Sequence, residues 1–111
     1  MSSPSTAVPP YLSALAPVIT GVVAPAAAEV DRTGTYPRAA LDALAAAGLL
    51  GLVSSTEVGG RGEGPRAATA VVQALAEHCG STAMVVMMHY CGTAVLEAHG
   101  PVEVREAIAR G

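Results

Sequence analysis

Residues 36–62, which read YPRAALDALAAAGLLGLVSSTEVGGRG, decide how this chain folds. Pro37 suits the first position of a helix, where its missing N–H group costs nothing. The apolar residues that follow recur with a helical period, and Gly48 is placed to end that helix. Residues 49–53 are apolar, but no neighbouring segment offers a partner strand. We therefore predict a loop there, which continues into the glycine-rich residues 59–64.

The segment before this stretch predicts one helix with a kink. Residues 10–30 are apolar and rich in alanine, and their larger side chains approximate a helical spacing. Pro17 and Pro25 argue against a straight helix, because proline lacks the N–H group that a helix interior needs. We expect this first helix to end near Asp31 and a turn to follow it.

Three further helices are predicted after the glycine-rich loop. Pro65 opens the first of them, and a cap formed by Ser81 or Thr82 opens the central one. The central helix is apolar nearly all round, so we expect it to be buried on every face. The last helix is amphipathic, and we expect Val104 and Ile108 to point inward. The expected buried face of the helix that Pro65 opens consists of Ala68, Val71, Val72, Leu75 and Cys79.

Together these elements predict an all-α fold, an orthogonal or up-down bundle of about five helices. A chain of 111 residues is long enough for one domain with a modest core. We assign that domain to residues 10–111. Residues 1–9 are small, polar or proline, and we expect them to form a disordered tail.

The charge pattern gives no support for binding to nucleic acids. The formal net charge is −3, and the six basic residues, all arginines, are scattered along the chain. Nucleic-acid-binding proteins gather basic residues on one face and often add aromatic side chains that stack on bases. We therefore expect no nucleic-acid partner. The three histidines lack the paired spacing of a metal site, so we expect no metal either.

Two cysteines, Cys79 and Cys91, flank an apolar run. A helix between them would hold them roughly 18 Å apart, too far for a disulfide. We expect two buried thiols in a reducing, cytoplasmic compartment. Residues 79–96 approach the length of a membrane span, but their polar and glycine residues favour a buried helix. Residues 1–28 lack the basic start of a signal peptide, so we expect neither a signal peptide nor a membrane span.

Two motifs suggest a ligand, and each has a simpler structural interpretation. Residues 59–64, GGRGEG, do not hold the glycine pattern of a dinucleotide site in register, so we interpret them as a flexible linker between helices. Met84, Met87 or Met88, and Cys91 share one helix face by their spacing. Core packing explains this face most simply, because methionine fills irregular gaps. The alternative is a flexible apolar wall for a lipid-like chain.

The order of these pieces resembles a known family. The pieces are DRTGTYPRAALDALAAAGLLGL (31–52), the glycines Gly59, Gly60 and Gly62, ALAEHCGSTAMVVMMH (74–89) and AHGPVEVREAIARG (98–111). Together they resemble the N-terminal helical domain of the acyl-CoA dehydrogenases, over residues 30–111. Residues 54–58 depart from the acidic and aromatic pattern that precedes the glycines in that family.

The resemblance implies flavin chemistry for a whole enzyme. In the family, a carboxylate removes the α-proton of an acyl-CoA thioester while FAD accepts hydride from the β-carbon. The carboxylate and the main flavin contacts belong to a middle and a C-terminal domain. We therefore expect no catalytic residue in this chain and no FAD binding by it alone. The chain is expected to be a truncated or split piece of an oxidoreductase of fatty-acid metabolism, inactive by itself.

The resemblance also implies a role for the central helix. In the family this helix forms part of the wall of the acyl-chain pocket, which makes Ala83, Met84, Met87 and Cys91 the substrate-pocket candidates. Without its natural cover the apolar helix would expose a patch, which favours association with the other domains or with a second copy of the chain.

Two alternatives stay open. One is a stand-alone helical interaction module that binds a partner through that patch. The other is the N-terminal part of a flavin-dependent monooxygenase of the same fold. His89 and Tyr90 are the candidate residues for that activity, since polar groups in the pocket suit a hydroperoxide better than a fatty chain.

Overall fold

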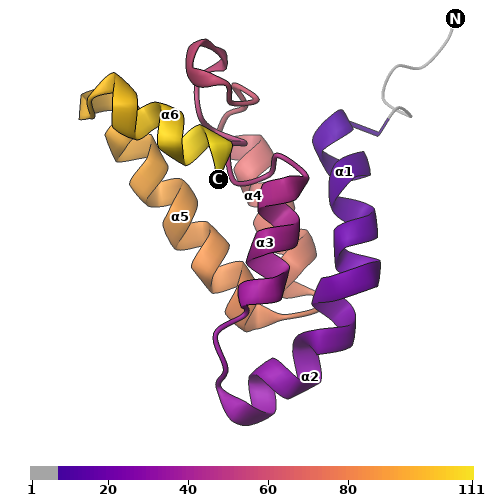
Figure 1. Cartoon of the computed structure of the whole chain (residues 1–111). Coiled ribbons are helices and arrows are strands. Elements are labelled where there is room, and N and C mark those ends of the chain that lie inside the picture. Colours follow the sequence, from indigo (N-terminus) through magenta and orange to yellow (C-terminus); the bar gives the residue numbers. More distant parts are fainter. Residues whose placement is uncertain (1–7) are drawn as a thin grey trace, which may run out of the picture.

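The chain folds into helices joined by short connections and by one longer loop over residues 47–64 (Figure 1). The computed structural model describes residues 8–111, and every regular element in that part is helical. The all-α prediction is therefore confirmed. So is the bundle of about five helices, because the first three segments form one continuous helix. Residues 1–7 of the predicted tail lie outside the described residues. The elements are α1 (Pro10–Val18), η2 (Ile19–Val23), α2 (Ala24–Thr33), α3 (Arg38–Ala46), η3 (Thr56–Val58), α4 (Pro65–Ala76), α5 (Gly80–His99) and α6 (Val102–Arg110).

The first helix changes direction at a π-helical turn, η2. Pro17 and Pro25 flank this turn, and neither can donate the N–H group that continues an α-helical ladder. The Ala24 amide donates instead to the Ile19 carbonyl five residues earlier, so the backbone stays hydrogen-bonded through the bend. Figure 1 shows α1 and α2 running in different directions. The predicted kink is confirmed, although the helix continues to Thr33, past its predicted end.

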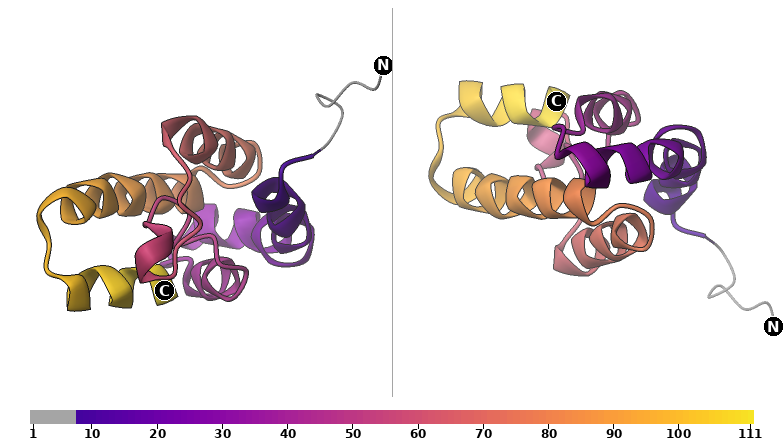
Figure 2. Two further views of the ribbon diagram at one scale, coloured as in Figure 1. Left: turned by 90° about the horizontal axis from the view of Figure 1, so that it is seen from above. Right: turned by 90° about the horizontal axis from the view of Figure 1, so that it is seen from below.

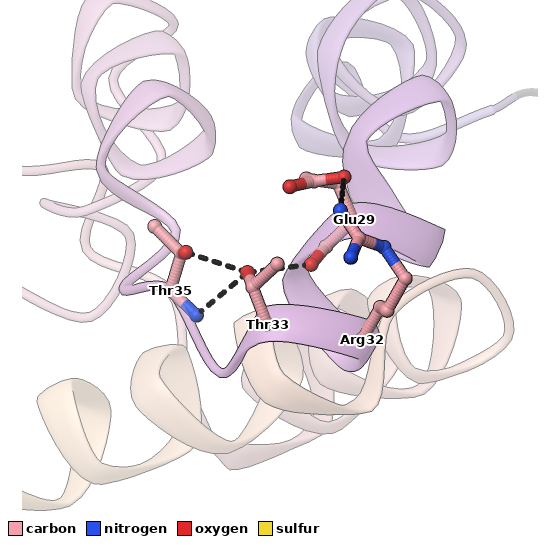
Figure 3. Close-up of polar contacts among 4 residues, drawn as sticks. All are labelled: Glu29, Arg32, Thr33 and Thr35. Atoms are coloured by element: carbon pink, nitrogen blue, oxygen red, sulfur yellow. Dashed lines mark hydrogen bonds and ion pairs between the residues drawn. The ribbon is translucent and has the colours of Figure 1, made fainter.

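Exposed polar contacts lie at the C-terminal end of α2 (Figure 3). Arg32 pairs with Glu29 at 2.6 Å, and both side chains are well exposed. The Thr33 hydroxyl donates to the Glu29 carbonyl oxygen at 2.8 Å and lies 2.6 Å from the Thr35 hydroxyl. Gly34 caps the helix with a φ of 70°. Each of these contacts joins residues at most four apart, so the turn into α3 is built locally.

α3 ends where the sequence predicts. Gly48 has a φ of 79°, a left-handed conformation that favours glycine. Its amide donates to the Ala45 carbonyl at 3.0 Å, and the Leu49 amide donates to the Leu44 carbonyl at 2.9 Å. These two bonds form a Schellman motif, which satisfies carbonyls at the helix end. The start differs by one residue, since Pro37 is the N-cap and not the first helical residue.

The helices form two layers. Figure 2 shows α4 and α5 on one side of the molecule and α3 and α6 on the other, with α1 closing one end. The described residues extend 45 × 39 × 19 Å, and the shortest dimension is about twice the diameter of one helix. Each helix therefore keeps a face that no other helix covers. The core between the layers is aliphatic, and its largest fully buried side chains are Leu15, Leu44, Leu49, Leu52 and Leu75.

For the last two helices, the predicted N-cap is wrong and the predicted inward face is only partly buried. α5 begins directly after its N-cap, Cys79, so Ser81 and Thr82 lie inside its first turn and do not cap it. The Thr82 hydroxyl donates instead to the Cys79 sulfur at 3.2 Å. In α6 the expected inward residues Val104 and Ile108 both line a pocket between α6 and α5, but Ile108 is half-buried, Val104 is 39% exposed, and the buried residue is Ala109.

Among the described residues one helix, Pro10–Thr33, is long and apolar enough to cross a membrane by length and composition alone. Its most apolar window has a mean hydropathy of 1.6, and 11% of that window is buried. The exposed positions of this helix carry small, charged or proline residues and no large apolar side chain. The sequence pattern had pointed to residues 79–96 as the segment closest to a span.

Candidate functional site

An apolar pocket lies between α4 and α5, beside the loop that joins α3 to α4 (residues 47–64, the α3–α4 loop). Its volume is about 700 Å³, within the range of pockets that hold small organic ligands. We call it the α4–α5 pocket. Its walls are Val53, Glu63, Gly64, Pro65, Ala68, Thr69, Val72, Gln73, Met87, Tyr90, Cys91 and Ala94.

Two of the four predicted substrate-pocket candidates line this pocket. Met87 and Cys91 lie one turn apart on α5, and Tyr90 lines the pocket beside them. Ala83 is buried in the core, and Met84 is 57% exposed; neither lines the pocket. The structure thus brings together one half of the predicted set, and its role toward a substrate stays a prediction.

The sequence predicted the α4 wall of the pocket as the buried face of a helix and not as part of a site. Ala68 and Val72 were expected to be buried, but both are half-buried and line the pocket. Thr69 and Gln73 share this wall and were not predicted as site residues. The sequence signal for this wall is the second apolar row of α4, Ala68 and Val72, beside the fully buried Val71. A helix with more apolar surface than its core contact needs has a face left for a ligand.

Few polar atoms in the pocket are available to a ligand. The Thr69 hydroxyl donates to a carbonyl of its own helix at 2.9 Å, and the Tyr90 hydroxyl donates to the Leu49 carbonyl at 2.7 Å. Within residues 8–111, the lining side chains that carry an oxygen or nitrogen atom and make no hydrogen bond are those of Glu63 and Gln73, and both residues are exposed. The interior therefore suits a hydrocarbon group, with polar groups at the mouth.

Tyr90 ties the pocket to the α3–α4 loop. The residue is 5% exposed, and its hydroxyl reaches a loop carbonyl 41 residues away in the sequence. Burial raises the pKa of Tyr90 well above its usual value, and the positive charge of Arg61 opposes that rise only in part. The phenol therefore stays protonated at neutral pH and acts as a hydrogen-bond donor.

His89 borders a different pocket. Its Nε2 atom lies 2.6 Å from the Leu50 carbonyl oxygen, and its ring lines a pocket of about 540 Å³ between α5 and α6. The rings of His89 and Tyr90 are 5.8 Å apart, but the polar atom of each contacts the backbone of the α3–α4 loop. The structure places the two monooxygenase candidates in separate pockets, and that role stays a prediction.

The mouth of the α4–α5 pocket is formed by a loop that folds back on itself. The Glu63 amide donates to the Leu52 carbonyl at 2.9 Å. The loop segments approach so closely that a Cβ atom on Gly60 would overlap the Ser54 backbone. We expected the glycine-rich residues to form a flexible linker, but these contacts give the loop one defined path.

Arg61 joins this loop to the end of α3. Its Nη2 atom donates to the Ala47 carbonyl at 3.0 Å and its Nε atom to the Gly48 carbonyl at 3.4 Å. A cation at a helix C-terminus is stabilised by the negative end of the helix dipole. Sequence reasoning gave Arg61 no role; an arginine in a glycine-rich turn that follows a helix end is the signal that could have indicated one.

An exposed apolar stripe follows the outward face of α5. Met84, Met88, Cys91 and Val95 repeat at i, i+4, i+7 and i+11, and all four are exposed. We call them the α5 stripe. The prediction that the central helix is buried on every face is therefore wrong, and so is the interpretation of its methionines as core. The exposed patch that the resemblance implied is present.

Both cysteines are free thiols. Cys79 is buried, as predicted, but Cys91 is exposed, because the outward face of α5 has no covering helix. In the part of the chain that the structure describes, no three His, Cys, Asp or Glu side chains are grouped to hold a metal ion.

Comparison with known proteins gives one match. The family model described as acyl-CoA dehydrogenase, N-terminal domain, matches residues 13–110. No curated protein and no solved structure gives a match. The family match spans nearly the whole chain and agrees with its all-helical architecture. The chain therefore belongs to the acyl-CoA dehydrogenase N-terminal domain family.

Proposed function

We propose that this domain serves an FAD-dependent oxidoreductase of the acyl-CoA dehydrogenase type, which acts on the CH–CH bond of an acyl-CoA thioester. In this proposal the α4–α5 pocket forms part of the wall around the acyl chain. The observation that carries the proposal is the apolar interior of that pocket, whose buried polar side chain, Tyr90, is already hydrogen-bonded to backbone. A hydrocarbon chain gains free energy by leaving water for such a site, whereas a polar ligand would lose hydrogen bonds there.

The glycine-rich loop is not built to hold the flavin. A flavin diphosphate needs free backbone amides or cations, but the Arg61 guanidinium is bound to carbonyls of α3 and Gly60 packs against Ser54. FAD and the catalytic carboxylate therefore belong, in this proposal, to other parts of a working enzyme. This chain contributes binding and orientation and no proton or hydride transfer. Two free thiols agree with a reducing compartment, and we propose a cytoplasmic location.

Cys91 offers a direct test of the pocket, because it is exposed and lines it. The rate of its modification by N-ethylmaleimide would be measured by mass spectrometry with octanoyl-CoA, with acetyl-CoA and without ligand. Octanoyl-CoA should slow the modification severalfold, because its chain fills the pocket, and acetyl-CoA should not. Equal rates in all three samples would contradict the proposal. Cys79 is buried, so its modification reports unfolding and serves as an internal control.

Two methionines of α5 give a matched pair of variants. Met87 lines the pocket, whereas Met84 does not. Met87→Gln places an amide in the apolar wall and should abolish the protection of Cys91 by octanoyl-CoA. Met84→Gln should leave the protection intact. Loss of protection in both variants would point to an effect on the whole helix rather than on the pocket.

The assignment of FAD to other parts of the enzyme is tested by a heat melt. We expect the Tm of the chain to be unchanged by micromolar FAD. A rise in Tm would contradict this assignment, because any ligand that binds the native state stabilises it.

A helical interaction module is the second candidate, and the α5 stripe favours it. Light scattering coupled to size-exclusion chromatography distinguishes the possibilities. A monodisperse monomer that melts cooperatively would favour an independent module. Association that the Met88→Gln variant reverses would show that the stripe is a contact surface, to be covered by a second copy or by further domains.

A further inference from the structure

α6 rests on the α3–α4 loop at a point where two backbones touch. A Cβ atom on Gly51 would lie 2.5 Å from the Ala109 carbonyl oxygen, closer than real Cβ atoms approach. Ala109 is itself buried. The end of α6 can therefore lie against this loop only while residue 51 is glycine.

An ion pair makes the second attachment. Arg105 of α6 donates to Glu97 of α5 at 2.9 Å, and both side chains are about one-fifth exposed. The hydrogen bond from Arg105 holds the pKa of Glu97 below its usual range. The ion pair fixes α6 to α5, and α6 also lies against η3 of the α3–α4 loop.

The segment of the loop beneath α6 also holds the mouth of the α4–α5 pocket. The Arg61 amide donates to the Gly51 carbonyl at 2.9 Å, and the Glu63 amide donates to the Leu52 carbonyl at 2.9 Å. Glu63 and its neighbour Gly64 line the pocket. One side of the loop therefore contacts α6 and the other side forms the pocket mouth.

Apart from these attachments α6 is loosely packed. The pocket of about 540 Å³ separates part of it from α5, and Val102 and Val104 are 51% and 39% exposed. An element with so little buried apolar surface opens locally at a smaller free-energy cost than the core.

We propose that α6 is a strap that holds the α3–α4 loop, and through it the mouth of the α4–α5 pocket, and that it opens as a unit while the α4–α5 core stays folded. The meaning of this strap for an acyl ligand rests on the proposed function. The coupling between α6 and the loop does not, because it is a property of the chain without ligand.

Amide hydrogen exchange, followed by NMR on the full chain, tests the strap. In Arg105→Gln the amides of residues 104–110 and the Glu63 amide should exchange about fivefold faster than in the parent chain, since the strap has lost its ion pair. The amide of Leu75, in the core, should be unchanged. Arg32→Gln is the matched control, because it removes an ion pair at the far end of the molecule, and it should alter neither set.

A second variant works through the other attachment. Gly51→Ala should speed exchange in the same two regions, whereas Gly21→Ala should not, because nothing lies within 4 Å of a Cβ atom there. The proposal is overturned if α6 exchanges only together with Leu75, or if α6 opens in both variants while the Glu63 amide keeps its protection. Neither readout needs a ligand, so a failure of octanoyl-CoA to protect Cys91 would leave this result standing.

Discussion

The connection from the last turn of α2 to α3 (residues 32–37) and the loop between α3 and α4 contain the same kinds of residue: glycine, hydroxyl side chains and an arginine whose guanidinium makes hydrogen bonds. In the first turn, Arg32, Thr33 and Gly34 contact residues within four positions, in full view of solvent (Figure 3). In the second, Arg61 reaches back 14 residues to α3, and Tyr90 of α5 reaches the loop across 41 residues.

This difference shows that the residue composition of a turn does not determine how much the turn contributes to folding stability. Contacts between exposed neighbours compete with water and restrain little of the chain. Contacts that are buried and distant in sequence hold separate helices together, and breaking one leaves a polar group without water. Four predictions test how much more the α3–α4 loop contributes to the free energy of unfolding than the α2–α3 turn does.

The largest difference is expected between two glycines. Gly60→Ala should destabilise the chain by about 3 kcal/mol, because its Cβ would overlap the Ser54 backbone and force the loop apart. Gly34→Ala should cost about 1 kcal/mol, since the added Cβ atom would contact no other atom and the alanine would strain only the left-handed cap. Urea denaturation measures both. Similar losses in the two variants would show that the backbone conformation, and not close packing, dominates.

Two hydroxyls give the next comparison. Tyr90→Phe should cost about 2 kcal/mol, because the buried Leu49 carbonyl loses its side-chain donor. Thr33→Val should cost at most about 0.5 kcal/mol, because water replaces its exposed hydrogen bonds. The same denaturation experiment applies. A Tyr90→Phe variant as stable as the parent chain would mean that the loop does not depend on this bond.

Alkaline pH should reduce the stability that the buried Tyr90 contributes. Because burial raises the pKa of Tyr90 in the folded chain, the folded state keeps its proton when the unfolded state has lost it. The stability that Tyr90 contributes is fully present below about pH 10 and should fall by about 1.4 kcal/mol per pH unit above it. Melts of the parent chain and Tyr90→Phe between pH 8 and about 11 would measure this. Parallel pH profiles of the two proteins would rule the explanation out.

The smallest difference is expected between two arginines. Arg61→Gln should cost about 1 kcal/mol through the loss of charged donors to the end of α3. Arg32→Gln should change stability by less than about 0.5 kcal/mol, although the Arg32–Glu29 distance of 2.6 Å is shorter than the hydrogen bonds of Arg61. A larger loss from Arg32→Gln would reverse the comparison and show that the α2–α3 turn restrains the helices after all.

The same contrast separates what the sequence could predict from what it could not. Pro37, Gly48 and Pro65 act on their immediate neighbours, so the ends of α3 and the start of α4 were predictable within about one residue. The bond from Tyr90 to Leu49 was not, because nothing local records a contact between residues 41 positions apart. The class of fold followed from local signals alone.

The candidate site was predictable only in part for a related reason. The helical period showed that Met87 and Cys91 share a face with Met84. It could not show which of these residues lie opposite α4 and therefore line the pocket. Hydropathy led us to bury α5 entirely, whereas the two-layer arrangement leaves Met84, Met88 and Val95 exposed. Only the packing of α4, α5 and the α3–α4 loop shows which residues of α5 face the pocket.

The π-helical turn in the first helix has a consequence for how this segment tolerates change in length. A single π-helical turn holds one residue more than an α-helical turn, because its hydrogen bonds span five residues instead of four. Deleting one residue from η2 would therefore restore an unbroken α-helix in which Leu15 and Val18 still face the core. The bend thus holds one spare residue, and a one-residue deletion there is the change in length that this helix should accept most readily.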